Sequence, residues 1–322
     1  MLVWAFQMLM TLVVLAFVVR QLQFALNELK TRNVSLAEIN WHWLGLGGVL
    51  YFASLLPAAS FWRQALLGLG NRPTVWRAYR AFLIGGVGKY IPGKAAVVFL
   101  RTVLVAGPHC TAASAGVAVF IETLTMMGVG GFLAAIVVTL LFRDQWLIAA
   151  LSASLAIAVI LPTIPRVTRK VAQVIRLQKL SGDILVRLEG WNVSLIVRGW
   201  VLESANWILQ TFSVWVCLRA LPQSFFENPQ HFASAQGLSQ AFPLLLVSTA
   251  LSTVVGFLLL IPAGLGVREI LVLNMLAPAI GHPAATTVSV LSRVVMILMD
   301  VLIAAVLYPI PSSDLAPENP SS

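Results

Sequence analysis

Basic side chains in the stretch 79–101, YRAFLIGGVGKYIPGKAAVVFLR, are the first residues whose types and spacing suggest chemistry. Lys89, Lys94 and Arg101 lie there among apolar residues, and Pro92 and Gly93 stand between the two lysines. Proline removes a backbone donor and glycine permits a sharp turn, so a helix is expected to break here. Freed backbone groups, ammonium groups and the N-terminus of the next helix would then converge on an anion such as a phosphate. The alternative is that these cations reach the lipid headgroups from an interfacial helix.

A second broken apolar segment, IPAGLGVRE, follows near the C-terminus. Pro262, Gly264 and Gly266 interrupt it, and Arg268 and Glu269 follow at once. Two apolar segments broken by proline and glycine are typical of transporter sites built from discontinuous helices, often in inverted repeats. We therefore expect Arg268 to face the first group of cations across a shared site.

Acidic residues inside apolar runs are expected to balance these cations. Glu122 lies near the centre of its run, either as a partner for a basic residue, as a proton carrier, or in a structural ion pair. Glu203 begins a polar stripe that Asn206 and Gln210 continue at helical spacing. A charge at the membrane centre costs about 2.5–3.5 kcal/mol on insertion scales, so such residues face the protein interior. The stripe lines a cavity or, equally well, bonds one helix to another.

Arg293 and Asp300 share one face of the last apolar run. They are separated by roughly 10 Å along a helix, which is too far for a direct pair. Each therefore needs another partner, and Glu122 or Glu203 could serve Arg293.

No catalytic constellation accompanies these residues. The sequence has no Ser–His–Asp spacing and no nucleotide-binding glycine loop, and its two cysteines and four histidines are scattered. We predict no catalytic residue, no metal, no cofactor and a protein that is not an enzyme.

The elements that must position these side chains are membrane helices. Of 322 residues, 59% are hydrophobic and 10% are charged, whereas about a quarter of a soluble domain is charged. Backbone polar groups in the hydrocarbon region must be paired within their own segment, which helices achieve. The composition therefore predicts an all-α polytopic membrane protein.

The apolar runs predict about seven spanning helices of roughly 20 residues each, and two broken half-helices arranged as inverted repeats. The spans are expected at 1–19, 41–62, 112–142, 146–161, 193–218, 241–261 and 284–308. Residues 1–310 form one transmembrane domain in this interpretation, and 311–322 a short disordered polar tail.

The charge balance predicts the orientation. The chain has 21 Lys and Arg against 12 Asp and Glu. The basic amphipathic segment 166–191 is the strongest cytoplasmic marker. Counting spans back from it places the predicted interfacial segment 63–80 and the first break, which ends at Arg101, on the same side. The N-terminus then lies in the cytoplasm. We expect a multi-pass protein of the cell inner (plasma) membrane.

Two stretches together resemble a known family. GKYIPGKAAVVFLR is similar to the first signature of the lysylphosphatidylglycerol synthase transmembrane-region family, and IPAGLGVREILVL to its second, P-G-G-L-G-V-R-E. Glu122 after the first motif and the Arg293/Asp300 pattern extend the resemblance over most of the chain. Ala263 replaces the first glycine of the second motif, and Thr123 stands where an arginine often follows the glutamate.

The resemblance implies an integral membrane protein that binds and flips an anionic phospholipid or a lipid-linked headgroup, without the soluble aminoacyltransferase domain. By motif, the resemblance implies that the candidate site or gating residues are Lys89, Tyr90, Pro92, Gly93, Lys94, Arg101, Glu122, Gly264, Gly266, Arg268 and Glu269. We expect headgroup binding by Lys89, Tyr90, Lys94, Arg101 and Arg268. Charge balance or gating is expected of Glu122, Glu203, Glu269, Arg293 and Asp300, and backbone breaks at Pro92, Gly93, Pro262, Gly264 and Gly266.

Two other functions stay open. A membrane enzyme or accessory subunit of a polyprenyl-phosphate or glycolipid pathway would bring carboxylates together at the lipid–water interface. A structural, non-transporting membrane protein would have no interior cavity and would pair its cations only with protein groups. The expected partners are anionic membrane lipids and, as a further option, a separate lipid-modifying enzyme, but not nucleic acid, because no soluble basic domain is present. The sequence does not indicate an oligomeric state.

Overall fold

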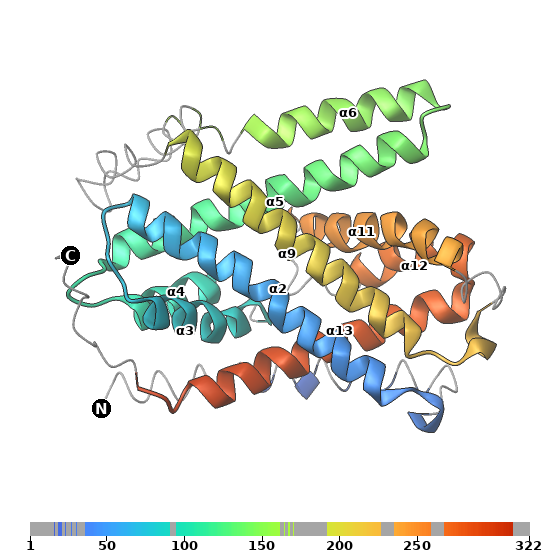
Figure 1. The fold of residues 1–322 in the computed structure, drawn as a ribbon, viewed down its shortest axis with the longest axis horizontal. Helices are drawn as coiled ribbons and strands as arrows, with labels where there is room; N and C mark the ends of the chain where they lie inside the picture. The colour runs from blue at the N-terminus through green and yellow to red at the C-terminus, as the bar shows by residue number, and fades with distance from the viewer. Residues whose placement is uncertain are drawn as a thin grey trace.

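The computed structural model describes residues 36–90, 95–161, 192–226, 235–258 and 267–311, with a few isolated positions besides. These residues form nine α-helices and three short 3-10 helices, and no strand occurs among them. The predicted all-α class is confirmed (Figure 1). The predicted span 1–19, the basic segment 166–191 and the tail 312–322 lie almost entirely outside the described residues.

Among the described helices, three are long and apolar enough to cross a membrane, namely α2 (Trp41–Gly68), α5 (Ala112–Leu141) and α13 (His282–Leu307). Helix α9 (Val193–Arg219) packs along α2, and the two run side by side through the middle of the molecule in Figure 1. Helix α6 (Trp146–Ile160) packs on α5. These helices suit a membrane-embedded protein, and the other predicted spans stay predictions.

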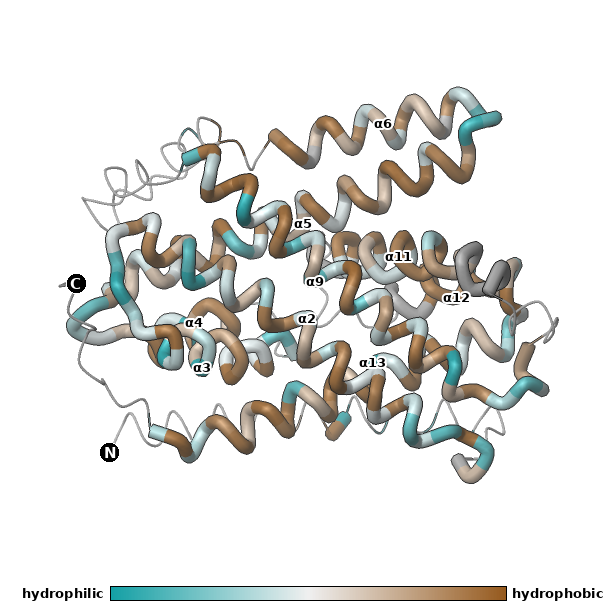
Figure 2. The backbone as a smooth tube through the Cα atoms, viewed as in Figure 1, coloured by the Kyte–Doolittle hydropathy of each residue, from teal (hydrophilic) through white to brown (hydrophobic). Residues whose placement is uncertain are grey.

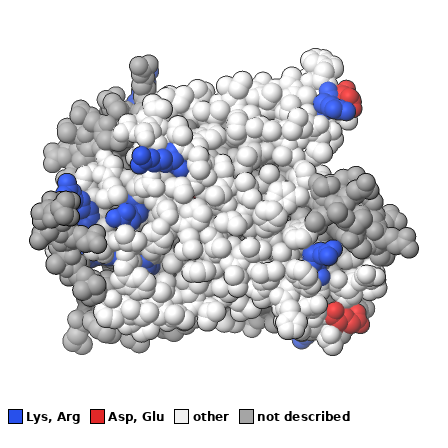
Figure 3. All heavy atoms as spheres, in the orientation of Figure 1, with Lys and Arg blue, Asp and Glu red and all other residues white. Residues whose placement is uncertain are grey.

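Apolar side chains face outward as well as inward. On α6, Leu147, Leu151 and Ile157 are exposed, and Figure 2 shows hydrophobic residues along most of the tube. On the face drawn in Figure 3, charged side chains gather toward the two ends, and an uncharged band lies between them. Hydrocarbon around this band would bury the outward-facing side chains and leave the charges near water.

Residues 63–80, predicted as one interfacial segment, are divided between two helices. Residues 63–68 continue α2 beyond its apolar run, and a turn at Gly70, where φ is 77°, leads to α3 (Val75–Gly85). Arg80 of α3 is buried, and its guanidinium donates to the backbone oxygens of Leu307 and Tyr308 at 3.0 and 2.8 Å. Arg80 thereby satisfies carbonyl groups at the end of α13 that have no intrahelical partner, whereas Val75 and Trp76 of the same segment remain exposed.

The regular α-helix ends before the first predicted break at Pro92 and Gly93. Helix α3 is followed by the 3-10 helix η2 (Gly86–Tyr90) and then by α4 (Ala95–Val105), which packs on α3. A Cβ at Gly88 would lie 2.6 Å from the backbone nitrogen of Val97, so only glycine permits this close approach. Pro92, Gly93 and Lys94 lie outside the described residues.

The second half of the bundle contains two further helices, which pack on each other. Helix α11 (Ala235–Leu258) contacts α12 (Val267–Ile280), and α12 contacts α13. The span predicted at 241–261 was placed too late, because α11 already starts at Ala235; η6 (Gln223–Phe225) precedes it. The remaining short helix is η1 (Leu36–Glu38). Pro262, Gly264 and Gly266, and the side chains of Arg268 and Glu269, lie outside what the structure describes.

Candidate functional site

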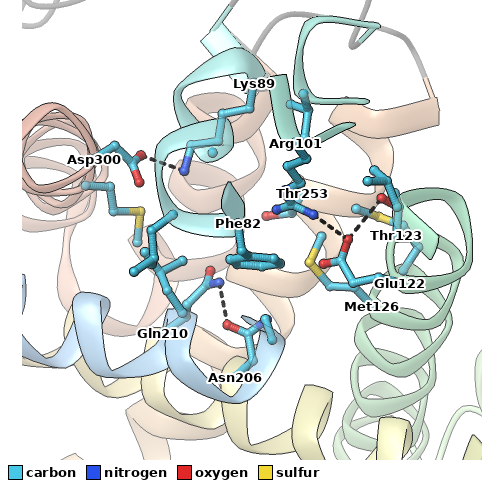
Figure 4. Close-up of a pocket in the computed structure, with 18 of the residues that line it drawn as sticks. Phe82, Lys89, Arg101, Glu122, Thr123, Met126, Asn206, Gln210, Thr253 and Asp300 are labelled. Atoms are coloured by element: carbon cyan, nitrogen blue, oxygen red, sulfur yellow. Dashed lines mark hydrogen bonds and ion pairs between the residues drawn. The ribbon is translucent and has the colours of Figure 1, made fainter. Parts of the chain in front are cut away.

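A cavity of about 500 Å³ lies between the helices at the level where η2 meets α13. Helices α2, α3, α4, α5, α9, α11 and α13 contribute its lining together with η2 (Figure 4). Most of the wall is apolar, formed by Leu55, Ala58, Phe82, Leu83, Val97, Val98, Val119, Phe120, Met126, Met127 and Met296. Polar groups are few and come from residues distant in sequence.

The first polar group is an ion pair between η2 and α13. Lys89 Nζ lies 2.6 Å from Asp300 Oδ2 and donates to the Tyr51 hydroxyl oxygen, also at 2.6 Å. Tyr51 donates in turn to Asp300 Oδ1 at 2.9 Å, and Tyr90 donates to Oδ2 at 2.5 Å. Asp300 is buried, whereas 38% of the Lys89 side chain remains exposed. Lys89 is therefore the more accessible residue of the pair.

The second polar group is an ion pair between α4 and α5. Arg101 Nη1 donates to Glu122 Oε2 at 2.9 Å, and the Thr123 hydroxyl donates to the same oxygen at 3.4 Å. The guanidinium carbon lies 3.7 Å from the centre of the Phe82 ring, so the ring supports the cation through its face. The cation of Glu122 thus comes from another helix, whereas the resemblance places an arginine at the position of Thr123.

The third polar group is the stripe predicted on α9. Asn206 Nδ2 donates to Glu203 Oε2 at 3.0 Å, and Gln210 Nε2 donates to Asn206 Oδ1 at 3.0 Å. Asn206 and Gln210 line the cavity, and Glu203 lies behind them with no exposed surface. Oε1 of Glu203 has no hydrogen-bond partner among the described residues. Two residues of the stripe therefore form part of the cavity wall, and the third lies in the layer of side chains directly behind it.

Helices α11 and α13 complete the wall. Ser252, Thr253 and Gly256 form the side that α11 contributes. Arg293 also lines the cavity from α13 and is buried, so Arg293 and Asp300 do share the predicted face. Glu122, one of the two partners expected for Arg293, is bonded to Arg101 instead.

The cavity collects most of the predicted site residues that the structure describes. Lys89, Tyr90, Arg101, Glu122, Arg293 and Asp300 all line it, and Glu203 lies directly behind. The predicted roles of Lys94, Arg268 and Glu269 fall outside the described side chains.

Sequence reasoning missed Tyr51 and Phe82. A signal existed for Tyr51, because tyrosine in a spanning helix is typical of the membrane interface and this one lies well inside an apolar run. Phe82 gave no signal, since one more aromatic residue in an apolar segment is unremarkable.

The lining carries three cations, Lys89, Arg101 and Arg293, and two carboxylates, Glu122 and Asp300. In a low-dielectric wall this balance favours a small anion over a cation. Within the described part of the chain, no group of three His, Cys, Asp or Glu side chains is placed to hold a metal ion.

Comparison with protein-family models and with curated protein sequences finds no match for this chain. The resemblance drawn from the two motifs therefore stays a prediction, and the geometry of the cavity carries the functional argument.

Proposed function

We propose that this chain binds the phosphate of an anionic lipid headgroup in the cavity and moves the headgroup across the inner (plasma) membrane. The observation that carries the proposal is the placement of the ion pairs Lys89–Asp300 and Arg101–Glu122 on the wall of an otherwise apolar cavity.

The ion pairs are suited to exchanging one anion for another. Both carboxylates hold their cations at hydrogen-bond distance, so a phosphate that displaces Asp300 or Glu122 replaces one charge-assisted hydrogen bond with another. The cations are never left alone in a low-dielectric site, where an unpaired charge is costly. In this mechanism the carboxylates balance the charge of the empty site.

The lining favours a lipid over a soluble anion. Val98 on α4 and Phe120 on α5 line the cavity and remain 38% and 43% exposed, so the wall is open at these two residues. An amphipathic ligand would enter between these two helices and keep its acyl chains outside. A free phosphate would gain nothing from apolar walls.

The proposed movement of the headgroup involves helices that are shorter than the membrane is thick. Helices α3 and α4 have 11 residues each and are roughly 16 Å long at the helical rise per residue, whereas the hydrocarbon core measures about 30 Å. We infer that they form a re-entrant half-helix pair, that α12 belongs to the second one, and that about seven other helices span the membrane with the N-terminus in the cytoplasm. Lys94 and Arg268 would join the headgroup site, and Glu269 the charge balance or gate. This arrangement is the one that the family resemblance implies.

The test is lipid inversion in reconstituted vesicles that carry a fluorescent anionic phospholipid. Lys89→Gln and Arg101→Gln are expected to slow inversion at least tenfold, and Lys94→Ala and Arg268→Ala to slow it as well. Arg143→Gln, in the exposed turn after α5, is the matched control and should leave the rate unchanged. Unchanged rates for the cavity variants would refute the proposal.

A purely structural role makes a different prediction. It is consistent with cations paired to protein groups. It also predicts that the interior has no cavity, whereas the described helices line one. Native mass spectrometry of the purified chain separates the two functions, because only a headgroup site retains an anionic lipid that Lys89→Gln releases.

A further inference from the structure

A carboxylate that the proposed headgroup site does not use lies directly behind it. Glu203 has no exposed surface, and only its Oε2 receives a hydrogen bond within the described chain, from Asn206 at 3.0 Å. Its Oε1 has no partner there. A buried carboxylate with so few donors is poorly stabilised as an anion and well suited to hold a proton.

Among the described residues, no cation is hydrogen-bonded to Glu203. Glu203 interacts electrostatically with Glu122 and Arg101, and the Arg101 guanidinium is hydrogen-bonded to Glu122. Within the described chain, Glu203 and Glu122 thus both interact with the Arg101 guanidinium. The other titratable groups that line the cavity are Tyr51 of α2, Lys89 and Tyr90 of η2, and Arg293 and Asp300 of α13, while α11 contributes Ser252 and Thr253.

We propose that Glu203 holds a proton in the empty site and that Glu122 takes up a second proton when a phosphodiester anion binds Arg101. The inference rests on the proposed headgroup site and adds a proton-binding site to it. Binding breaks the hydrogen bond between Arg101 and Glu122 and forms one between Arg101 and the phosphate. Glu122 then gains an O–H bond from a solvent proton. The negative charge of the anion and the positive charge of the proton enter together, so the buried site keeps its net charge.

The sign of the pH dependence follows from this stoichiometry. The bound state holds one proton more than the empty state, so binding strengthens as the pH falls. Linkage makes the slope about tenfold in Kd per pH unit for one proton. The probe must not titrate itself, and a phosphomonoester, whose second ionisation lies near pH 6, is unsuitable for that reason.

The experiment measures binding of short-chain phosphatidylglycerol, a phosphodiester, to the full chain in detergent between pH 5.5 and 8.5. The wild type should lose affinity as the pH rises, by up to tenfold per pH unit. Glu122→Gln should still bind and should lose this slope, because an amide replaces the protonated acid. Glu203→Gln should bind and keep the slope. Asp144→Asn, an exposed acid in the turn after α5, is the control and should behave as the wild type.

Infrared difference spectroscopy assigns the two protons. The carbonyl band of a protonated carboxylic acid should be present in the empty wild type and absent in Glu203→Gln. A second such band should appear on addition of the lipid and be absent in Glu122→Gln. The inference is overturned if empty Glu203→Gln keeps the carbonyl band of the empty wild type. It is also overturned if the affinity of Glu122→Gln for the lipid still depends on pH as in the wild type.

The outcomes separate the two proposals. Failure of the wild type to bind the lipid at any pH refutes the headgroup site itself. Binding that is independent of pH refutes only the proton coupling. The soluble headgroup diester glycerophosphoglycerol forms a second arm: equal affinity for it would overturn the assignment to a lipid, and weaker binding supports it.

Discussion

The ion pair between Lys89 and Asp300 offers the sharpest test of whether the cavity binds an anion. Asp300→Asn removes the carboxylate that receives Lys89 at 2.6 Å, Tyr51 at 2.9 Å and Tyr90 at 2.5 Å. Two consequences follow in opposite directions. The empty protein should become less stable, and its affinity for an anion should increase.

The magnitude of the stability loss depends on how far the ammonium is buried. Removing one partner of a fully buried pair costs about 3–5 kcal/mol. The Lys89 side chain keeps 38% of its surface exposed, so water screens the charge that remains, and we expect a loss of about 2–3 kcal/mol. Thermal unfolding of the purified chain in detergent measures this loss as a lower Tm.

The gain in affinity has the same origin. In the wild type an anion must displace Asp300, whereas in Asp300→Asn the ammonium has no competing carboxylate. We expect short-chain phosphatidylglycerol to bind at least tenfold more tightly, which corresponds to about 1.4 kcal/mol. Titration of the detergent-solubilised variant with this lipid measures the change.

A double variant serves as the control. Lys89→Met combined with Asp300→Asn removes both charges, so much of the lost stability should return and the gain in affinity should disappear. A purely structural ion pair predicts the loss of stability without any gain in affinity. Weaker or unchanged lipid binding by Asp300→Asn would therefore refute the reasoning.

Two further predictions concern packing and thiol chemistry. A Cβ at Gly199 would lie 2.3 Å from Cε2 of Phe61, which is fully buried, so Gly199→Ala should cost about 1–3 kcal/mol and lower the Tm. Gly45→Ala, within α2 and with nothing within 4 Å of the added Cβ, should not lower the Tm, because alanine favours the helix more than glycine does. Burial raises the pKa of the Cys110 thiol, in the turn before α5, to about 11. The thiolate is the reactive species, so maleimide labelling of Cys110 should be slow at pH 7, rise with pH and become fast on unfolding, and fast labelling of the folded protein at pH 7 would contradict this.

Helix positions followed closely from the apolar runs. The run at 112–142 became Ala112–Leu141, the run at 146–161 became Trp146–Ile160, and the run at 193–218 became Val193–Arg219. In an apolar environment each segment must pair its own backbone, so run length translates directly into helix length. The rule failed at the end of α2, which continues to Gly68, because polar residues end an apolar run without ending a helix.

Some residues of the site could also be predicted from the sequence alone. Charged residues in apolar runs are costly wherever they occur, so Lys89, Arg101, Glu122, Arg293 and Asp300 could be selected one by one. The cavity that collects them could not be predicted, because it depends on how helix faces meet. The roles of Tyr51 and Phe82 depend on that meeting too, since neither side chain carries a charge.

By itself the sequence determined the helical class, the positions of several helices and the identity of the residues that cannot face lipid. Only the tertiary structure decided which charged residues form ion pairs. Lys89 pairs with Asp300 rather than with a headgroup alone, and Glu122 pairs with Arg101 rather than with Arg293. The physical reason is that burying a charge has a cost that any segment reveals, whereas the partner that offsets this cost lies on another helix. Which helix supplies it depends on close contacts such as Gly88 against Val97, which place η2 and α4 in the wall of the cavity.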